Sequence, residues 1–121
     1  MAHRILIVED HVESAESLAE LLELWGHETH VAYDGPTGVA RARIVRPTVA
    51  LVDLGLPHMD GCAVARTLRD DGLTDVLLVA LTGRDDPEAR ARIAAAGFDL
   101  HVVKPVDLAK LEQLLATSPA G

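Results

Sequence analysis

Apolar runs and amphipathic stretches alternate along the chain. Short apolar runs rich in β-branched residues recur five times, and longer stretches rich in Ala, Leu, Glu and Arg separate them. Such runs are typical of buried strands, and apolar residues spaced three and four apart are typical of helices that cover a core. The pattern predicts strands at 4–8, 28–32, 49–52, 76–81 and 100–103, the second at a sheet edge, with a helix after each.

The expected helices are marked by apolar spacing and by residues that start or end helices. Leu18, Leu21, Leu22 and Trp25 form one apolar stripe, and Gly26 can end that helix in the left-handed conformation. The later helices are expected at 37–45, at 61–69, from the 85–87 turn to 96 with Gly97 as its cap, and at 106–115 with Leu108, Leu111 and Leu115 on one face.

Strands that are apolar on both faces and alternate with helices predict one architecture. Right-handed crossovers place the helices on both faces of a parallel sheet. We therefore expect an α/β domain with a doubly wound, five-stranded parallel sheet in the flavodoxin-like order 2-1-3-4-5 and five helices. The domain is expected to span 1–117, with 118–121 as a tail or the start of a linker.

Composition and charge limit the classes of partner that the protein is expected to bind and the places in the cell where it is expected to be. A net charge of −8, with the basic residues dispersed along the sequence, argues against binding to nucleic acid or to an anionic membrane. The apolar run at 5–8 is too short for a signal peptide or a membrane span, so we expect a soluble, cytoplasmic protein. The single cysteine, Cys62, cannot form an internal disulfide and is expected to pack in the core.

Polar residues that could bind a ligand or take part in a reaction follow four of the predicted strands. Glu9 and Asp10 follow the first strand, Asp53 the third, Thr82 the fourth and Lys104 the fifth. In a doubly wound sheet the carboxyl ends of these strands meet at one edge, where the binding crevice lies. The sequence therefore predicts one site built from four separate positions.

The predicted site suits a metal ion and a phosphoryl group. Three converging carboxylates repel one another unless a cation lies between them, and all-oxygen ligands favour Mg²⁺. Asp53 can then act as the nucleophile toward phosphorus, while Lys104 stabilises the charge and the Thr82 hydroxyl donates a hydrogen bond. Phosphoryl transfer is the expected chemistry.

Four motifs resemble the receiver domains of bacterial two-component response regulators, the CheY-like family. They are Glu9-Asp10, the run from Asp53 to Gly61, Leu81-Thr82-Gly83 and Val103-Lys104-Pro105. The resemblance covers nearly the whole chain. It implies a phosphoacceptor at Asp53 that receives its phosphoryl group from a histidine kinase or a phosphotransfer protein. Such a domain assists its own phosphorylation and dephosphorylation and is not an enzyme in the usual sense.

The resemblance also implies roles for individual residues. Glu9, Asp10, Asp53 and the backbone carbonyl of Gly55 would bind Mg²⁺. Thr82 and His101 would occupy the switch positions, Lys104 would contact the phosphoryl group, and the Lys104-Pro105 bond would be cis.

Two residues depart from the family pattern. Glu9 stands where the family often has Asp, and this longer acid is expected to reach the metal through water. His101 stands where the family usually has Tyr or Phe. It either turns inward on phosphorylation or stays exposed on the fifth strand, and weak coupling to the output surface is the expectation.

Other interpretations stay open at this point. Asp10 or Asp53 alone could be a helix cap. A hydrolase of the haloacid-dehalogenase type also phosphorylates an aspartate, but it requires an acid where this chain has Gly55. A degenerate receiver would keep the fold without phosphorylation. The chain could be a stand-alone regulator or a part of a hybrid histidine kinase.

Several polar side chains are expected to have no special chemistry. His3, His27, His30 and His58 lack mutual metal-ligand spacing and are expected to be exposed or in loops, whereas the role of His11, beside the acidic pair, is left open. Glu13, Glu16, Glu20 and Glu23 are expected to form the solvent face of the first helix.

Overall fold

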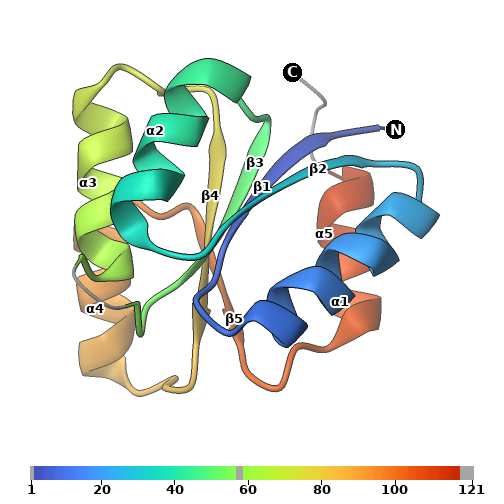
Figure 1. The fold of residues 1–121 in the computed structure, drawn as a ribbon. Coiled ribbons are helices and arrows are strands. Elements are labelled where there is room, and N and C mark those ends of the chain that lie inside the picture. The colour runs from blue at the N-terminus through green and yellow to red at the C-terminus, as the bar shows by residue number, and fades with distance from the viewer. Residues whose placement is uncertain (1, 57–58, 118–121) are drawn as a thin grey trace.

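A computed structural model describes residues 2–56 and 59–117 of the chain. Within them, five parallel strands form one sheet in the order β2-β1-β3-β4-β5, which confirms the predicted doubly wound fold (Figure 1). The strands are β1 Arg4–Val8, β2 Glu28–Ala32, β3 Val49–Asp53, β4 Leu77–Thr82 and β5 Leu100–Val103. The helices are α1 Val12–Leu24, α2 Gly35–Val45, α3 Gly61–Asp70, α4 Pro87–Ala95 and α5 Leu108–Thr117.

The sheet separates two apolar layers. Helices α1 and α5 cover one face, and α2, α3 and α4 cover the other (Figure 1). Because side chains alternate along a strand, Leu6 and Val8 of β1 pack toward α2 and α3, while Ile5 and Ile7 pack toward α1 and α5. All four side chains are fully buried, which explains why β1 is apolar without interruption.

Most predicted element boundaries agree with the structure to within two residues, and the differences have local causes. Helix α2 begins at Gly35 because Asp34 caps it, its carboxylate accepting the Thr37 N–H at 2.8 Å. Helix α5 begins at Leu108, two residues later than predicted, because Asp107 accepts the N–H of Ala109 at 3.0 Å.

Two side chains have a burial that the sequence did not specify. His3 lies in the segment before β1, outside the helices and strands, but it is 2% exposed, because the start of β1 and the end of α5 enclose its ring. Leu108 lies in the first turn of α5 and is 48% exposed, whereas Leu111 and Leu115 are buried. Cys62 is buried, which confirms its packing role, and His58 lies outside the described residues.

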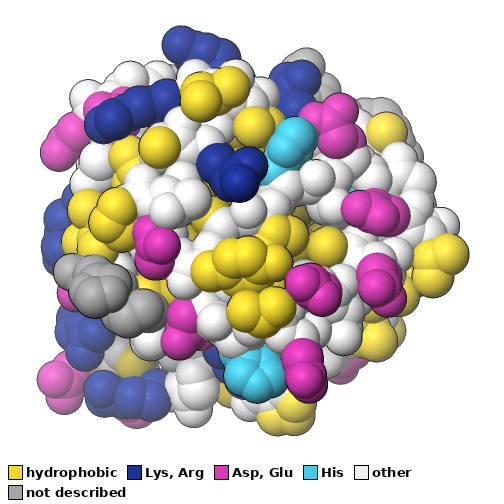
Figure 2. Space-filling view, in the orientation of Figure 1, with side chains coloured by type: hydrophobic (Ala, Val, Ile, Leu, Met, Phe, Trp, Pro, Cys, Tyr) yellow, Lys and Arg dark blue, Asp and Glu magenta, His cyan; other side chains and the backbone are white. Residues whose placement is uncertain are grey.

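Charge is distributed unevenly over the two helical layers. Helix α1 carries four exposed glutamates and no Lys or Arg, as predicted for its solvent face. The opposite layer carries six arginines: Arg41, Arg43, Arg66, Arg69, Arg90 and Arg92. Figure 2 shows acidic side chains over α1 and many of the basic ones over α2, α3 and α4. The basic residues, dispersed in sequence, are thus concentrated on one side. No helix in the described part of the chain is long and apolar enough to cross a membrane.

Candidate functional site

Three carboxylates converge where β1 and β3 end. Val8 of β1 is paired with Val52 of β3, so the residues that follow, Glu9 and Asp53, are neighbours. Oxygens of Glu9, Asp10 and Asp53 all lie within 4.8 Å of one another. Glu9 and Asp53 are each 7% exposed, whereas Asp10 is exposed. The cluster therefore has two buried members and one that faces solvent.

A glycine lets α3 approach the base of this cluster. A Cβ atom on Gly61 would lie 2.5 Å from the Asp53 carbonyl oxygen and 2.8 Å from Leu54 Cα. No other residue fits this contact without a shift of the backbone. The close approach fixes the end of β3, and with it the position of the Asp53 side chain.

Lys104 is the basic partner of the cluster. Its Nζ lies 3.1 Å from Asp53 Oδ2 and 3.4 Å from Glu9 Oε1. Its backbone N–H donates to the Thr82 carbonyl at 2.7 Å, which fixes the strand end from which the side chain reaches the acids. The Lys104-Pro105 peptide bond is cis, as the resemblance implied. Burial lowers the pKa of Lys104, but the contacts with Asp53 and Glu9 outweigh burial and raise it.

The two buried carboxyls have opposite pKa shifts. Burial raises the pKa of Glu9, and the adjacent Asp53 carboxyl raises it further. Burial also acts to raise the pKa of Asp53, but hydrogen bonds with Glu9 and with the Gly55 N–H outweigh it and hold this pKa below its ordinary value. Asp53 is thus the member of the pair that keeps its negative charge most readily.

The donor set fits a hard divalent cation. Three carboxylates converge and Lys104 supplies one positive charge, so negative charge is left uncompensated at the strand ends. Oxygen ligands with an exposed side suit Mg²⁺, which retains water and accepts phosphate oxygens. Gly55 lies in the turn after β3 and donates its N–H to Asp53 Oδ1 at 3.0 Å. Its carbonyl as a fourth ligand stays a prediction.

Thr82 ends β4 with its hydroxyl engaged by the following loop. The hydroxyl oxygen accepts the Arg84 N–H at 3.1 Å and donates to the Arg84 carbonyl at 3.2 Å. The residue is 5% exposed. Any turn of this hydroxyl toward a group on Asp53 would break both bonds and alter the β4–α4 loop.

His101 of β5 is neither free in solvent nor turned into the core. Its side chain is 30% exposed, and Nε2 lies 2.9 Å from Asp85 Oδ1. The same carboxylate oxygen accepts a hydrogen bond from Arg90 Nε at 2.8 Å. Sequence reasoning missed Asp85 as the partner of His101, because only the fold brings the β4–α4 loop beside β5.

The capping interpretation of the two aspartates was wrong. The residue that caps α1 is His11, whose Nδ1 accepts the Ser14 N–H at 3.2 Å. Helix α3 is capped by Asp60. The role left open for His11 is therefore a structural one, and its backbone N–H also donates to Glu9 Oε2 at 3.2 Å.

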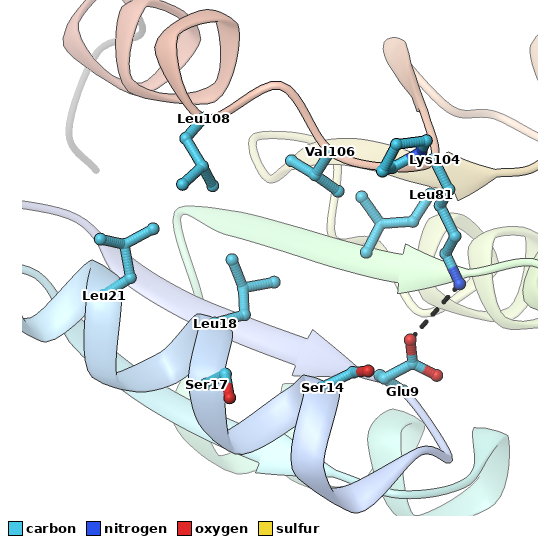
Figure 3. Close-up of a pocket in the computed structure, with 10 residues that line it drawn as sticks. Glu9, Ser14, Ser17, Leu18, Leu21, Leu81, Lys104, Val106 and Leu108 are labelled. Atoms are coloured by element: carbon cyan, nitrogen blue, oxygen red, sulfur yellow. Dashed lines mark hydrogen bonds and ion pairs between the residues drawn. The ribbon is translucent and has the colours of Figure 1, made fainter.

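An apolar groove adjoins the site. It lies between α1 and the segment that joins β5 to α5, and its volume is about 420 Å³. Figure 3 shows Leu18 and Leu21 of α1 facing Val106 and Leu108, with the Glu9 and Lys104 pair at one end. A molecule bound in the groove would therefore lie next to the acidic cluster.

Comparison with known proteins agrees with this geometry. The family model described as the response regulator receiver domain matches residues 5–116. The response regulator MprA of Mycobacterium bovis is 35% identical over 116 residues, which cover 96% of this chain and 49% of MprA. The response regulator PleD of Caulobacter vibrioides is 37% identical over 111 residues, which cover 88% of this chain and 24% of PleD. This chain thus spans about half the length of MprA and about a quarter of PleD.

A solved structure adds information on the metal. The receiver domain of the sensor histidine kinase PA1611 from Pseudomonas aeruginosa matches with a TM-score of 0.87 and 27% identity, over 98% of each chain. That structure has a magnesium ion coordinated in its active-site cleft.

Proposed function

This chain belongs to the response regulator receiver domain family, and from that premise we propose that Asp53 accepts a phosphoryl group from a histidine kinase or a phosphotransfer protein. A receiver domain is a signalling phosphoacceptor and not a classical enzyme. The observation that carries the assignment is the buried Asp53 carboxylate, which lies 3.1 Å from Lys104 inside a cluster of three acids. A cytoplasmic location follows from the proposal, because ATP, the phosphoryl source of kinases, is inside the cell.

Three residues of this chain have separate roles in the phosphoryl transfer. A carboxylate oxygen of Asp53 forms a bond to phosphorus as the phosphorus–nitrogen bond of the donor histidine breaks and its electron pair returns to nitrogen. Lys104 stabilises the charge on the phosphoryl oxygens, and the Thr82 hydroxyl leaves Arg84 to donate a hydrogen bond to one of them.

The magnesium ligands in this proposal are Glu9, Asp10, Asp53 and the Gly55 carbonyl. Bound Mg²⁺ would neutralise the carboxylates and supply open positions for phosphoryl oxygens. The convergence of the three side chains on one point and the exposed side of Asp10 support this set.

Labelling by acetyl phosphate tests the proposal. The chain, incubated with acetyl phosphate and Mg²⁺, should gain one phosphoryl group by intact mass, and Asp53→Asn should gain none. Asp75→Asn, which changes an exposed aspartate near the opposite end of the sheet, is the matched control and should be labelled like the parent. Equal labelling of Asp53→Asn would refute the phosphoacceptor assignment.

A further inference from the structure

A buried histidine connects three elements far from the acidic cluster. His3 precedes β1, and its Nδ1 lies 3.0 Å from Thr48 Oγ1, just before β3. Its Nε2 lies 2.7 Å from the carbonyl oxygen of Leu115 in α5. Carbonyls in the last turn of a helix lack an amide partner within the helix, so His3 satisfies one of them from outside. Nothing in the phosphoryl-transfer site uses these contacts.

The hydrogen-bond partners of the His3 ring limit where its hydrogen lies. The Leu115 carbonyl can only accept, so Nε2 must carry the hydrogen. The Thr48 hydroxyl has one hydrogen, which it can donate either to Nδ1 or to the Arg4 carbonyl at 3.2 Å, and a neutral ring satisfies both of its contacts when that hydrogen is donated to Nδ1. A ring enclosed to this degree, 2% exposed, depends on both partners.

A second histidine holds the backbone that carries this ring. The His3 N–H donates to His27 Nδ1 at 2.9 Å, and the two rings are 5.4 Å apart. His27 Nδ1 must therefore be unprotonated. Adding a proton there would place two donors opposite each other and break the bond.

We propose that His3, His27, Thr48 and Leu115 form an acid-sensitive histidine latch that holds the end of α5 against the start of the sheet. Protonation of His27 removes its contact with the His3 backbone, the start of β1 moves, and the His3 ring then loses the Leu115 carbonyl. Through the latch, the position of the end of α5 depends on pH, and this dependence is independent of phosphorylation at Asp53.

The surroundings of His27 favour the closed latch at neutral pH. Burial lowers the pKa of His27, and the electrostatic effect of the neighbouring His3 ring acts in the same direction. The other titratable group that lines its pocket is Glu112 of α5, beside Trp25 and Ala116. Glu28, the next residue along, pairs its carboxylate with His30 instead.

The sign of the pH dependence follows from this direction. A histidine with a lowered pKa in the folded state contributes stability that is complete above the ordinary value of 6.5 and is lost as the pH falls below it. The latch should therefore open on mild acidification, while the fully buried strands keep their structure.

Amide hydrogen exchange followed by NMR tests the latch. Between about pH 7.5 and about pH 5, after correction for intrinsic rates, exchange in the last turn of α5 should accelerate about tenfold relative to β3, the factor that one pKa unit represents. In His27→Phe the acceleration should disappear, whereas His30→Gln, which changes a nearby partly exposed histidine outside the latch, should respond like the parent. Thr48→Val, which keeps the side-chain shape, should raise exchange at the end of α5 at every pH.

Two outcomes would overturn the proposal. One is exchange in the last turn of α5 that does not change over this pH range in the parent. The other is an acceleration of equal size in His27→Phe, which would assign the acid response to other groups.

Discussion

The imidazole of His101 lies 2.9 Å from the carboxylate of Asp85, so the residue at the proposed switch position is tied to the β4–α4 loop. Asp85 also accepts a hydrogen bond from Arg90. Inward rotation of His101 therefore has to break a contact with a charged partner, in addition to burying a polar ring.

We predict that this contact weakens the coupling between Asp53 and the surface formed by α4, β5 and α5. His101→Tyr should enlarge the amide shift changes that beryllofluoride produces across that surface, because the substitution removes the imidazole contact with Asp85. Asp85→Asn should do so to a smaller extent. Large changes in the parent that neither substitution alters would contradict a limiting role for His101.

Asp10→Asn should weaken Mg²⁺ binding and raise the stability of the metal-free protein. Asp10 is the exposed member of the cluster, so its removal relieves repulsion without leaving a buried gap. The loss in Mg²⁺ affinity should be at least about tenfold, measured by titration calorimetry. Asp75→Asn serves as the control, and an Asp10→Asn variant that bound Mg²⁺ like the parent would remove Asp10 from the ligand set.

Glu9→Gln should stabilise the metal-free protein at neutral pH. Burial and the neighbouring Asp53 raise the pKa of Glu9, so its charged form costs folding free energy above the folded-state pKa. The gain should shrink as the pH falls through the folded-state pKa and vanish below the ordinary value of 4.5, where the parent carboxyl is protonated in both states. Thermal melts with EDTA over this range measure the effect, and a gain that grows toward acid pH would contradict it.

Gly61→Ala should destabilise the fold and reduce labelling of Asp53. The new Cβ would meet the Asp53 carbonyl oxygen at 2.5 Å, and relief of such overpacking costs about 1–3 kcal/mol. Gly83→Ala is the control, since a Cβ there meets nothing within 4 Å. Urea denaturation measures the loss of stability, and acetyl phosphate labelling measures the loss of phosphorylation. Equal stability of both variants would show that α3 can move away from β3 without a cost in folding free energy.

Leu108→Ser should slow transfer from a protein donor without affecting acetyl phosphate. Leu108 is half exposed at the groove that adjoins Lys104, where we expect the donor domain to pack. The decrease in transfer rate should be about tenfold, equivalent to about 1.4 kcal/mol of contact energy. Leu24→Ser, at the far end of α1, is the matched control, and an equal loss in both variants would place the donor elsewhere.

The strands and the acids that follow them could be predicted because their signals are local, whereas the strand order was taken from the flavodoxin-like topology. Each buried strand is apolar throughout, and Asp53 follows such a run directly. The start of α5 could also have been placed correctly, since Asp107 is a good cap in front of Leu108. The prediction began this helix two residues too early because it followed the apolar spacing back to Val106.

The contacts that were missed join residues distant in sequence. His3 bonds to Thr48, 45 residues away, and to Leu115, 112 residues away. A single histidine before a strand carries no local signal of such partners, so a position that is exposed or in a loop was the natural expectation. The same holds for His101 and Asp85, which are 16 residues apart and meet only because β5 lies beside the β4–α4 loop.

Helix α1 carries four glutamates and no basic residue, whereas on the opposite layer Arg43, Arg69 and Arg90 pair with aspartates, so the α1 side is a concentrated part of the net charge of −8. A donor domain with a positive surface would experience a torque that turns α1, and the groove beside it, toward the donor before contact. This orientation acts over distances comparable to the Debye length, about 8 Å at physiological ionic strength. Added salt should therefore slow the encounter of the two proteins while leaving the rate of transfer within their complex unchanged.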